Sequence, residues 1–245
     1  MDAEAPAGDG LLSPAAFTRD DESPDDRFYV VPRKVVHIDD GAIAALGSLY
    51  TEILPPGGRL LDLMSSWRSH LPPGFRAGSV VGLGLNAEEM ADNAHLTAHV
   101  VHDVNREARL PFDDAEFDGG MCAVSIQYVI HPVRLLREVR RVLRPGAPFV
   151  VSFSNRCFPT KAVAVWLDTT DAQHVGLVRA YFDAAGGWAE LKDEDRSPGR
   201  GDPLYAVWGR AASGTIDPRP MTRRPDSLRP RSSNTGATDS IFRFA

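Results

Sequence analysis

Short apolar runs alternate with amphipathic stretches through the middle of this chain, and this order constrains its fold more than any other feature. The runs typical of strands lie at 59–63, 78–85, 98–103, 118–130, 147–154, 188–194 and 203–210. Apolar residues at helical spacing occupy 40–53, 86–93, 132–143, 160–169 and 171–187. Strands that alternate with helices at short spacing predict an α/β fold with a doubly wound sheet.

The predicted sheet has seven strands, is mostly parallel and is Rossmann-like. The run at 118–130 is apolar enough for its middle. The last two runs are joined by a loop rich in Gly, Pro and Ser, which predicts an antiparallel ribbon at one edge. In such sheets the ligand crevice lies at the carboxyl ends of the strands, near the point where the strand order reverses.

The predicted domain covers residues 28–210. Residues 1–27 and 211–245 are dominated by Ala, Gly, Pro, Ser, Asp and Arg and show little apolar periodicity, so both are expected to be mostly disordered tails. A chain of 245 residues with 43% hydrophobic residues can bury one sizeable core. We therefore expect one domain with two tails.

Composition argues against several classes of partner and compartment. The formal net charge of −6 offers no overall attraction to nucleic acid or to anionic membranes. Two cysteines without zinc-type spacing predict no metal site and a reducing compartment. The N-terminus lacks the features of a signal peptide, and no apolar run is long enough to span a membrane. A cytoplasmic location is the expectation, with no prediction for the oligomeric state.

Several motifs together resemble the class I S-adenosylmethionine-dependent methyltransferases of the type 11 kind. The motifs are an apolar strand ending in Asp62, VVGLGLN at 80–86, LPFDDAEFD at 110–118 and LLREVRRVLRPG at 135–146. The likeness covers roughly residues 58–210. The wider run, including MSSWRSHLP and SFSNRCFPTKAV, also resembles an uncharacterised plant and bacterial branch of that family.

The resemblance implies S-adenosylmethionine as cofactor and assigns its binding residues. Family members carry glycines after the acid of the first strand, whereas this chain has Met64, Ser66 and Arg68 at those positions. A position that needs a positive φ would therefore be strained or reorganised. The family's acid for the ribose hydroxyls aligns with Gly84. The predicted cofactor-binding residues are Asp62, Met64, Ser65, Ser66, Asn86 and Asp103, with Asp103 beside the adenine.

Two roles are open for Ser65 and Ser66: they form the turn, or they offer hydroxyls to the cofactor in place of close backbone approach. The predicted substrate-binding residues follow the fourth and fifth strands and are Gln127, Tyr128, Asn155, Arg156 and Lys161. Arg156 and Lys161 are suited to an anionic group, while Asn155 and Thr160 could equally cap the next helix. His70, His102 and His131 are scattered and are predicted to be packed rather than catalytic.

The predicted function is methyl transfer to a small molecule. Methyl transfer needs few obligatory catalytic residues, so the sequence leaves these unassigned. The alternative is a binding or scaffold module that keeps the sheet but has lost or weakened cofactor binding, as the missing glycines would allow. A nicotinamide enzyme is a distant third, because no G-x-G-x-x-G follows the first strand.

Overall fold

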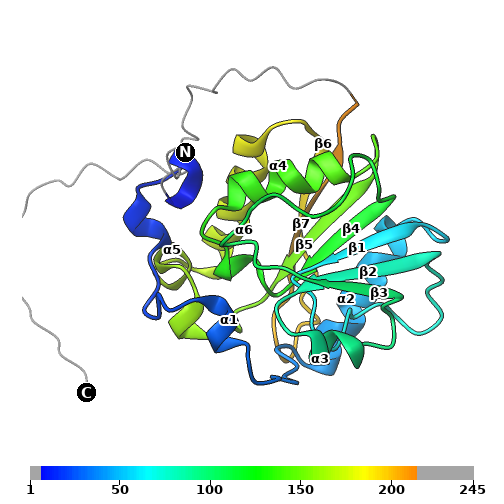
Figure 1. Ribbon diagram of the computed structural model, residues 1–245, viewed down its shortest axis with the longest axis horizontal. Helices are drawn as coiled ribbons and strands as arrows, with labels where there is room; N and C mark the ends of the chain where they lie inside the picture. The colour runs from blue at the N-terminus through cyan, green and yellow to red at the C-terminus, as the bar shows by residue number, and fades with distance from the viewer. Residues whose placement is uncertain (1–6, 214–245) are drawn as a thin grey trace, which may run out of the picture.

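The computed structural model describes residues 7–213, which form a seven-stranded sheet with helices on both faces (Figure 1). The strand order is β3-β2-β1-β4-β5-β7-β6. The strands are β1 Arg59–Leu63, β2 Ser79–Gly84, β3 Ala98–Val101, β4 Gly119–Ala123, β5 Pro148–Phe153, β6 Trp188–Asp195 and β7 Tyr205–Ala211. Strands β1 to β5 pair in parallel, and β7 runs antiparallel to both β5 and β6. The predicted fold class is confirmed.

Six α-helices accompany the described strands, and local signals account for where the longer ones begin. They are α1 Asp25–Phe28, α2 Asp40–Ile53, α3 Ala87–Ala91, α4 Pro132–Val142, α5 Ala164–Leu167 and α6 Asp171–Ala185. The carboxylate of Asp39 accepts the Ala42 N–H at 2.9 Å, and the amide oxygen of Asn86 accepts the Glu89 N–H at 3.0 Å. Proline occupies the first turn of α4, where its missing N–H costs nothing.

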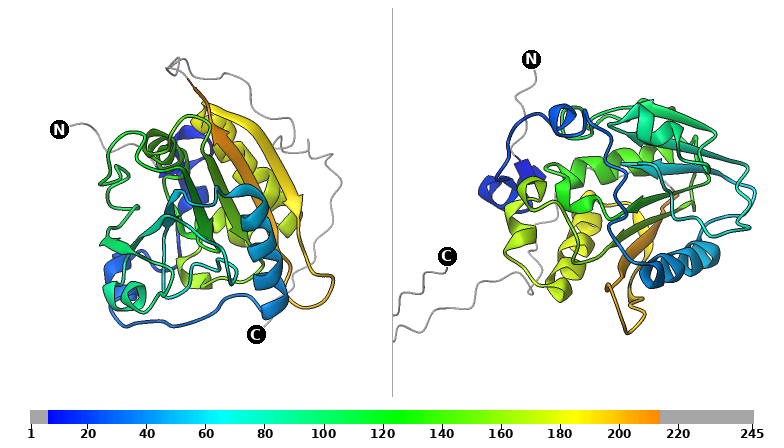
Figure 2. Two further views of the ribbon diagram at one scale, coloured as in Figure 1. Left: turned by 90° about the vertical axis from the view of Figure 1, so that its right-hand side faces the viewer. Right: turned by 90° about the horizontal axis from the view of Figure 1, so that it is seen from below.

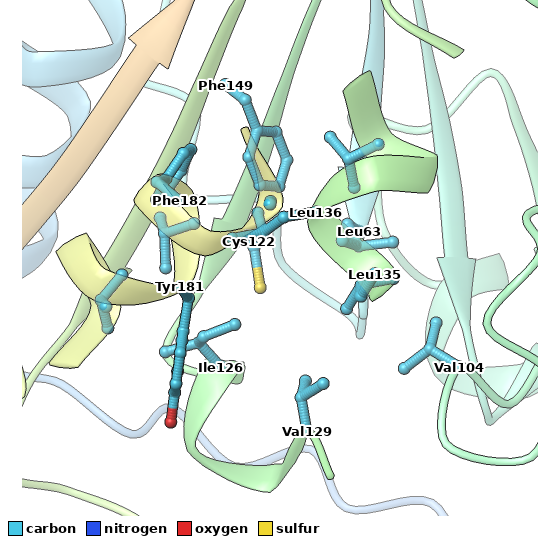
Figure 3. Packing of buried hydrophobic residues seen from close by; sticks show 14 of the residues in the cluster. Leu63, Val104, Cys122, Ile126, Val129, Leu135, Leu136, Phe149, Tyr181 and Phe182 are labelled. Carbon is cyan, nitrogen blue, oxygen red and sulfur yellow. The ribbon is translucent and has the colours of Figure 1, made fainter. Parts of the chain in front are cut away.

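The sheet separates two apolar cores. Alternate side chains of β1 point to opposite faces, so Leu60 packs with α2 while Leu61 and Leu63 pack with α4 and α6. Figure 2 shows α2 on the face opposite α4 and α6. Figure 3 shows the second core, in which Cys122 and Phe149 of the sheet lie against residues of α4 and α6. Both faces of the central strands are covered, which explains their continuous apolar sequences.

The strand order reverses between β1 and β4. Strands β2 and β3 follow β1 on one side, whereas β4 and β5 lie on its other side. This reversal separates the connections at the carboxyl ends of β1 and β4 and opens a crevice there. Asp62 lies next to the end of β1 and Gly84 ends β2, so both border this crevice.

The expectation of a disordered N-terminal tail was wrong for residues 7–27. Short 3₁₀ turns at Ala7–Gly10 and Pro14–Phe17 lie against the domain, and the blue segment in Figure 1 runs past α5 to α1. Phe17 is 1% exposed and packs against Tyr181 of α6, with ring centroids 6.2 Å apart. Single anchors on irregular turns leave no periodic pattern in the sequence. The predicted C-terminal tail lies outside the described residues beyond residue 213.

Two predicted elements are shorter than expected. The fourth strand ends at Ala123, because Val124 turns out of the sheet with φ of 47°, and residues Ile126–Tyr128 form a 3₁₀ turn. The helix predicted at 160–169 is divided into a 3₁₀ turn at Pro159–Lys161 and α5. The residues that follow β4 and β5 are therefore placed by irregular backbone.

Candidate active site

One large cavity opens at the carboxyl ends of the first four strands. Its empty space, including the part open to solvent, amounts to about 1130 Å³. Its polar lining includes Asp62 from β1, Asn86 and Glu89 at the cap and first turn of α3, Asp103 after β3 and Ser125 after β4. All of these residues lie near the carboxyl end of a parallel strand or in the segment that follows it, as expected for a ligand crevice in this sheet type.

Side-chain hydrogen bonds hold the loop after β1, where the family has glycines. Met64 adopts φ of 57°, the left-handed region that favours glycine. The Ser65 hydroxyl donates to Asp62 Oδ2 at 2.7 Å, and the Ser69 hydroxyl donates to the same oxygen at 2.6 Å. Asn93 Nδ2 donates to the Ser66 carbonyl and to Ser69 Oγ, both at 2.9 Å. The loop is thus a reorganised turn, with one strained residue at its start.

Asp62 is a buried carboxylate that faces the cavity. It is 3% exposed, and its Oδ1 atom has no hydrogen-bond partner among the described residues. Burial raises the pKa of Asp62 to about 6, although the hydrogen bonds from Ser69 and Ser65 oppose this rise. A free carboxylate oxygen at the end of β1 is available to a ligand that donates a hydrogen bond.

The hydroxyls of both predicted serines are already engaged by carboxylates. Ser65 donates to Asp62, and Ser66 donates to Glu89 Oε2 at 2.5 Å. The hypothesis that these hydroxyls contact the cofactor directly is therefore not supported in this arrangement, in which they orient two carboxylates instead. Sequence reasoning missed Glu89, whose only signal was an acidic residue in the first turn after the second strand.

Asn86 and Asp103 both line the cavity, as predicted. Asn86 caps α3 with its oxygen and donates from Nδ2 to the Tyr29 carbonyl at 2.8 Å. Asp103 Oδ1 accepts the Asn105 N–H at 2.9 Å and the Arg106 N–H at 3.3 Å. Since these bonds use one oxygen of Asp103, the other is left for a ligand donor.

The N-terminal segment roofs the cavity, which sequence reasoning did not foresee. Tyr29, Arg33, Val35 and His37 all line it. Trp67 Nε1 donates to the Val35 carbonyl at 3.1 Å, tying the segment to the loop after β1. Aromatic rings pack together in and beside the roof. Phe28 contacts Phe158 edge-on, with ring centroids 5.4 Å apart, and Tyr128 stacks on Phe158 with centroids 6.2 Å apart. The Arg33 guanidinium lies 4.0 Å from the Phe28 ring centroid.

Lys161 was predicted to bind substrate, but its ammonium is already engaged by the N-terminal segment. The side chain is 1% exposed; Nζ donates to the Ser23 carbonyl at 2.7 Å and lies 3.2 Å from carboxylate oxygens of Asp21 and Asp25. Arg19 Nη1 also donates to both carboxylate oxygens of Asp25, each at 2.9 Å. Lys161 lines the cavity, yet these contacts make it the anchor of the roof.

The other predicted substrate residues are placed differently from one another. Tyr128 lines the cavity, and its hydroxyl accepts the Phe158 N–H at 2.8 Å. Gln127 is buried beside it and donates to the Val124 carbonyl at 2.9 Å. Arg156 is exposed and paired with Asp202 at 2.7 Å, and Asn155 is exposed next to it. The structure does not bring Gln127, Asn155 or Arg156 to the cavity lining.

The sequence predicted His70, His102 and His131 to be packed rather than catalytic. Two of them, His70 and His102, line the cavity together with His37. Burial lowers the pKa of His70 to about 4, with further lowering by Arg68, His37 and His95. Burial also lowers the pKa of His37. Both imidazoles are therefore neutral near pH 7. Within residues 7–213, no group of three or more His, Cys, Asp or Glu could hold a metal ion.

Residues 68–151 match the sequence model of the methyltransferase domain family, type 11. Over these residues, which make up less than half of the chain, the sequence is similar to the methyltransferase domains of that family. The match begins at Arg68, so the unusual residues Asp62 to Trp67 precede it. That family points to S-adenosylmethionine as the cofactor. No curated protein matches the chain by sequence.

Solved structures share the fold of this chain at low sequence identity. A chain from the complex of the Haloferax volcanii Trm112 methyltransferase activator with a methyltransferase aligns with a TM-score of 0.55 and 16% identity, over 72% of this chain and 92% of that one. The 4+2 cyclase SpnF aligns at 0.51 and 17%, over 77% and 92%. A SAM-dependent methyltransferase of Aquifex aeolicus aligns at 0.50 and 15%, over 77% and 97%.

The cavity residues fit an adenosyl cofactor. Carboxylate oxygens without partners among the described residues lie at the ends of β1 and β3, and apolar Leu85 and Val104 lie between the polar groups. Such a mixture of apolar walls and a few directed acceptors is typical of cofactor sites. None of the helices within residues 7–213 has the length and hydropathy of a membrane span.

Proposed function

We propose that this protein transfers a methyl group from S-adenosylmethionine to a small-molecule acceptor held under the roof formed by residues 25–37. The observation that carries the proposal is the position of Asp62, a buried carboxylate with a free oxygen at the carboxyl end of β1, beside the reversal of strand order. A buried carboxylate is costly to the fold, so its retention in a cavity indicates a ligand role.

The bound cofactor would supply a methyl group on a sulfonium, which is already activated for displacement. The chain's own residues then have to bind, orient and exclude water. The rings of Tyr29, Tyr128 and Phe158 offer faces that stabilise a cation in a partly desolvated space. The roof segment limits the entry of water from the side opposite the sheet. Tyr128 is the proposed contact for the acceptor.

A small acceptor suits the site better than a polymer. The roof lies over the cavity and is fastened at three residues. Trp67 bonds to Val35, Asn86 bonds to Tyr29, and Lys161 pairs with Asp25. The net charge of −6 offers no general attraction to nucleic acid. An acceptor of limited size therefore fits the enclosed space under the aromatic roof.

Calorimetric titration with S-adenosylmethionine and S-adenosylhomocysteine tests the proposal. We expect both to bind the wild-type protein, and Asp103→Ala to weaken binding about tenfold or more, with little change in melting temperature. The matched control is Asp113→Ala, an exposed carboxylate outside the cavity. A site with a binding free energy of about −4 kcal/mol would be half filled at about 1 mM ligand. Absence of binding at that concentration would contradict the proposal and favour a scaffold module without cofactor.

A further inference from the structure

The carboxyl end of β2 carries no carboxylate and has no room for one. A Cβ atom added to Gly84 would lie 2.1 Å from the carbonyl oxygen of Ser65 and 3.2 Å from Met90 Sδ. The reorganised loop after β1 therefore fills the space that a side chain on Gly84 would need. An acidic partner for a ribose diol, the usual arrangement in nucleotide sites of such sheets, has to come from another position.

Glu89 brings a carboxylate into the same part of the cavity. It projects from α3, which begins directly after β2, and it is 4% exposed while lining the cavity. Oε1 accepts the backbone N–H of Arg33 from the roof, and Oε2 accepts the Ser66 hydroxyl at 2.5 Å. No Lys, Arg or His within residues 7–213 forms an ion pair with it.

This arrangement leaves Glu89 only partly satisfied. An ionised carboxylate has about four positions that accept hydrogen bonds, and the two contacts fill one on each oxygen. A buried carboxylate without a cation is unfavourable unless further donors reach it. Two hydroxyl donors on neighbouring carbons match the two oxygens of one carboxylate.

We propose that Glu89 is a cofactor-binding residue that accepts hydrogen bonds from the ribose hydroxyls of the adenosyl cofactor, in place of an acid at the end of β2. The inference rests on the proposed function. It also gives Ser66 a role, since its hydroxyl fixes the orientation of the Glu89 carboxylate at the position where the family has a glycine. The Arg33 contact would link the roof to the occupied site.

The test compares S-adenosylhomocysteine with its 2′-deoxy and 3′-deoxy analogues on wild-type protein and on Glu89→Gln. Because each lost hydrogen bond is to a charged group, removal of one ribose hydroxyl should weaken binding to the wild-type protein about 10- to 100-fold. In Glu89→Gln this discrimination should fall to within about threefold. The matched control is Glu88→Gln, which removes the same charge from an exposed neighbour on α3 and should keep the full discrimination.

The outcomes separate this inference from the proposed function. If Glu89 only fastens the roof, Glu89→Gln will weaken the ribose and deoxyribose ligands by the same factor, which overturns the inference while the function stands. Wild-type protein that does not distinguish the deoxy analogues overturns it too, even if Glu89→Gln fails to fold. Wild-type protein that does not bind S-adenosylhomocysteine at about 1 mM overturns both.

Discussion

Asp62→Asn should stabilise the folded protein at neutral pH, although it removes a cavity carboxylate. The pKa of Asp62 is raised from 3.8 to about 6 by burial. One pKa unit corresponds to about 1.4 kcal/mol, so the ionised side chain costs the native state about 3 kcal/mol above pH 7. The substituted asparagine would keep an oxygen that accepts the Ser65 and Ser69 hydroxyls and would carry no charge.

The effect has a defined pH dependence. Because the native pKa lies above the unfolded value, the native state binds the proton more tightly between about pH 4 and pH 6. The stability from this proton is therefore complete below about pH 4 and is lost as the pH rises through 6. The stability difference between Asp62→Asn and wild type should grow from about 1 kcal/mol near pH 4.5 to about 3 kcal/mol at pH 8.

Urea denaturation across this pH range measures the difference. The control is Asp26→Asn, which neutralises an exposed carboxylate on α1 and should show no comparable rise with pH. A difference that stays constant from pH 4.5 to 8, or a variant less stable than wild type at pH 8, would refute the view that Asp62 is a buried charge retained for a ligand.

Three further perturbations test the loop, the end of β2 and the roof. Met64→Gly should be more stable than Met64→Ala by about 1 kcal/mol in urea denaturation, because φ is 57°; the reverse order would mean the left-handed conformation is not adopted. Gly84→Asp should lower the free energy of unfolding by about 2 kcal/mol or more, and tighter cofactor binding with unchanged stability would contradict the steric reasoning. Lys161→Met should cost about 3 kcal/mol and expose the roof to trypsin, whereas an unchanged cleavage pattern would show that Lys161 does not anchor it.

The sheet could be predicted because its signals are local. Apolar runs marked each strand, and the caps at Asp39 and Asn86 and the proline at the start of α4 marked the helices. The same signals located Asp62 and Asp103 at strand ends, where parallel topology brings them to one cavity. The resemblance also identified the Met64 position as one where the backbone would be unusual, and its φ is positive.

The roof could not be predicted, because its anchors are far apart in the sequence. Asp25 and Lys161 meet only in the folded chain, and neither has a local pattern that reveals the other. From the sequence, a lysine that follows a strand is expected to bind an anionic ligand. In the folded chain Lys161 instead binds the carboxylates of Asp21 and Asp25. Glu89 was overlooked for a similar reason, since burial distinguishes it from Glu88 and composition does not.

The most direct test of the central claim is the position of S-adenosylhomocysteine in a crystal structure of its complex with this protein. We predict the adenosyl group in the cavity at the carboxyl ends of β1, β2 and β3, with the adenine beside Asp103 and the roof segment closed over it. A ligand bound elsewhere on the protein, or a cavity still closed to the ligand at saturating concentration, would contradict the assignment of this cavity as the cofactor site.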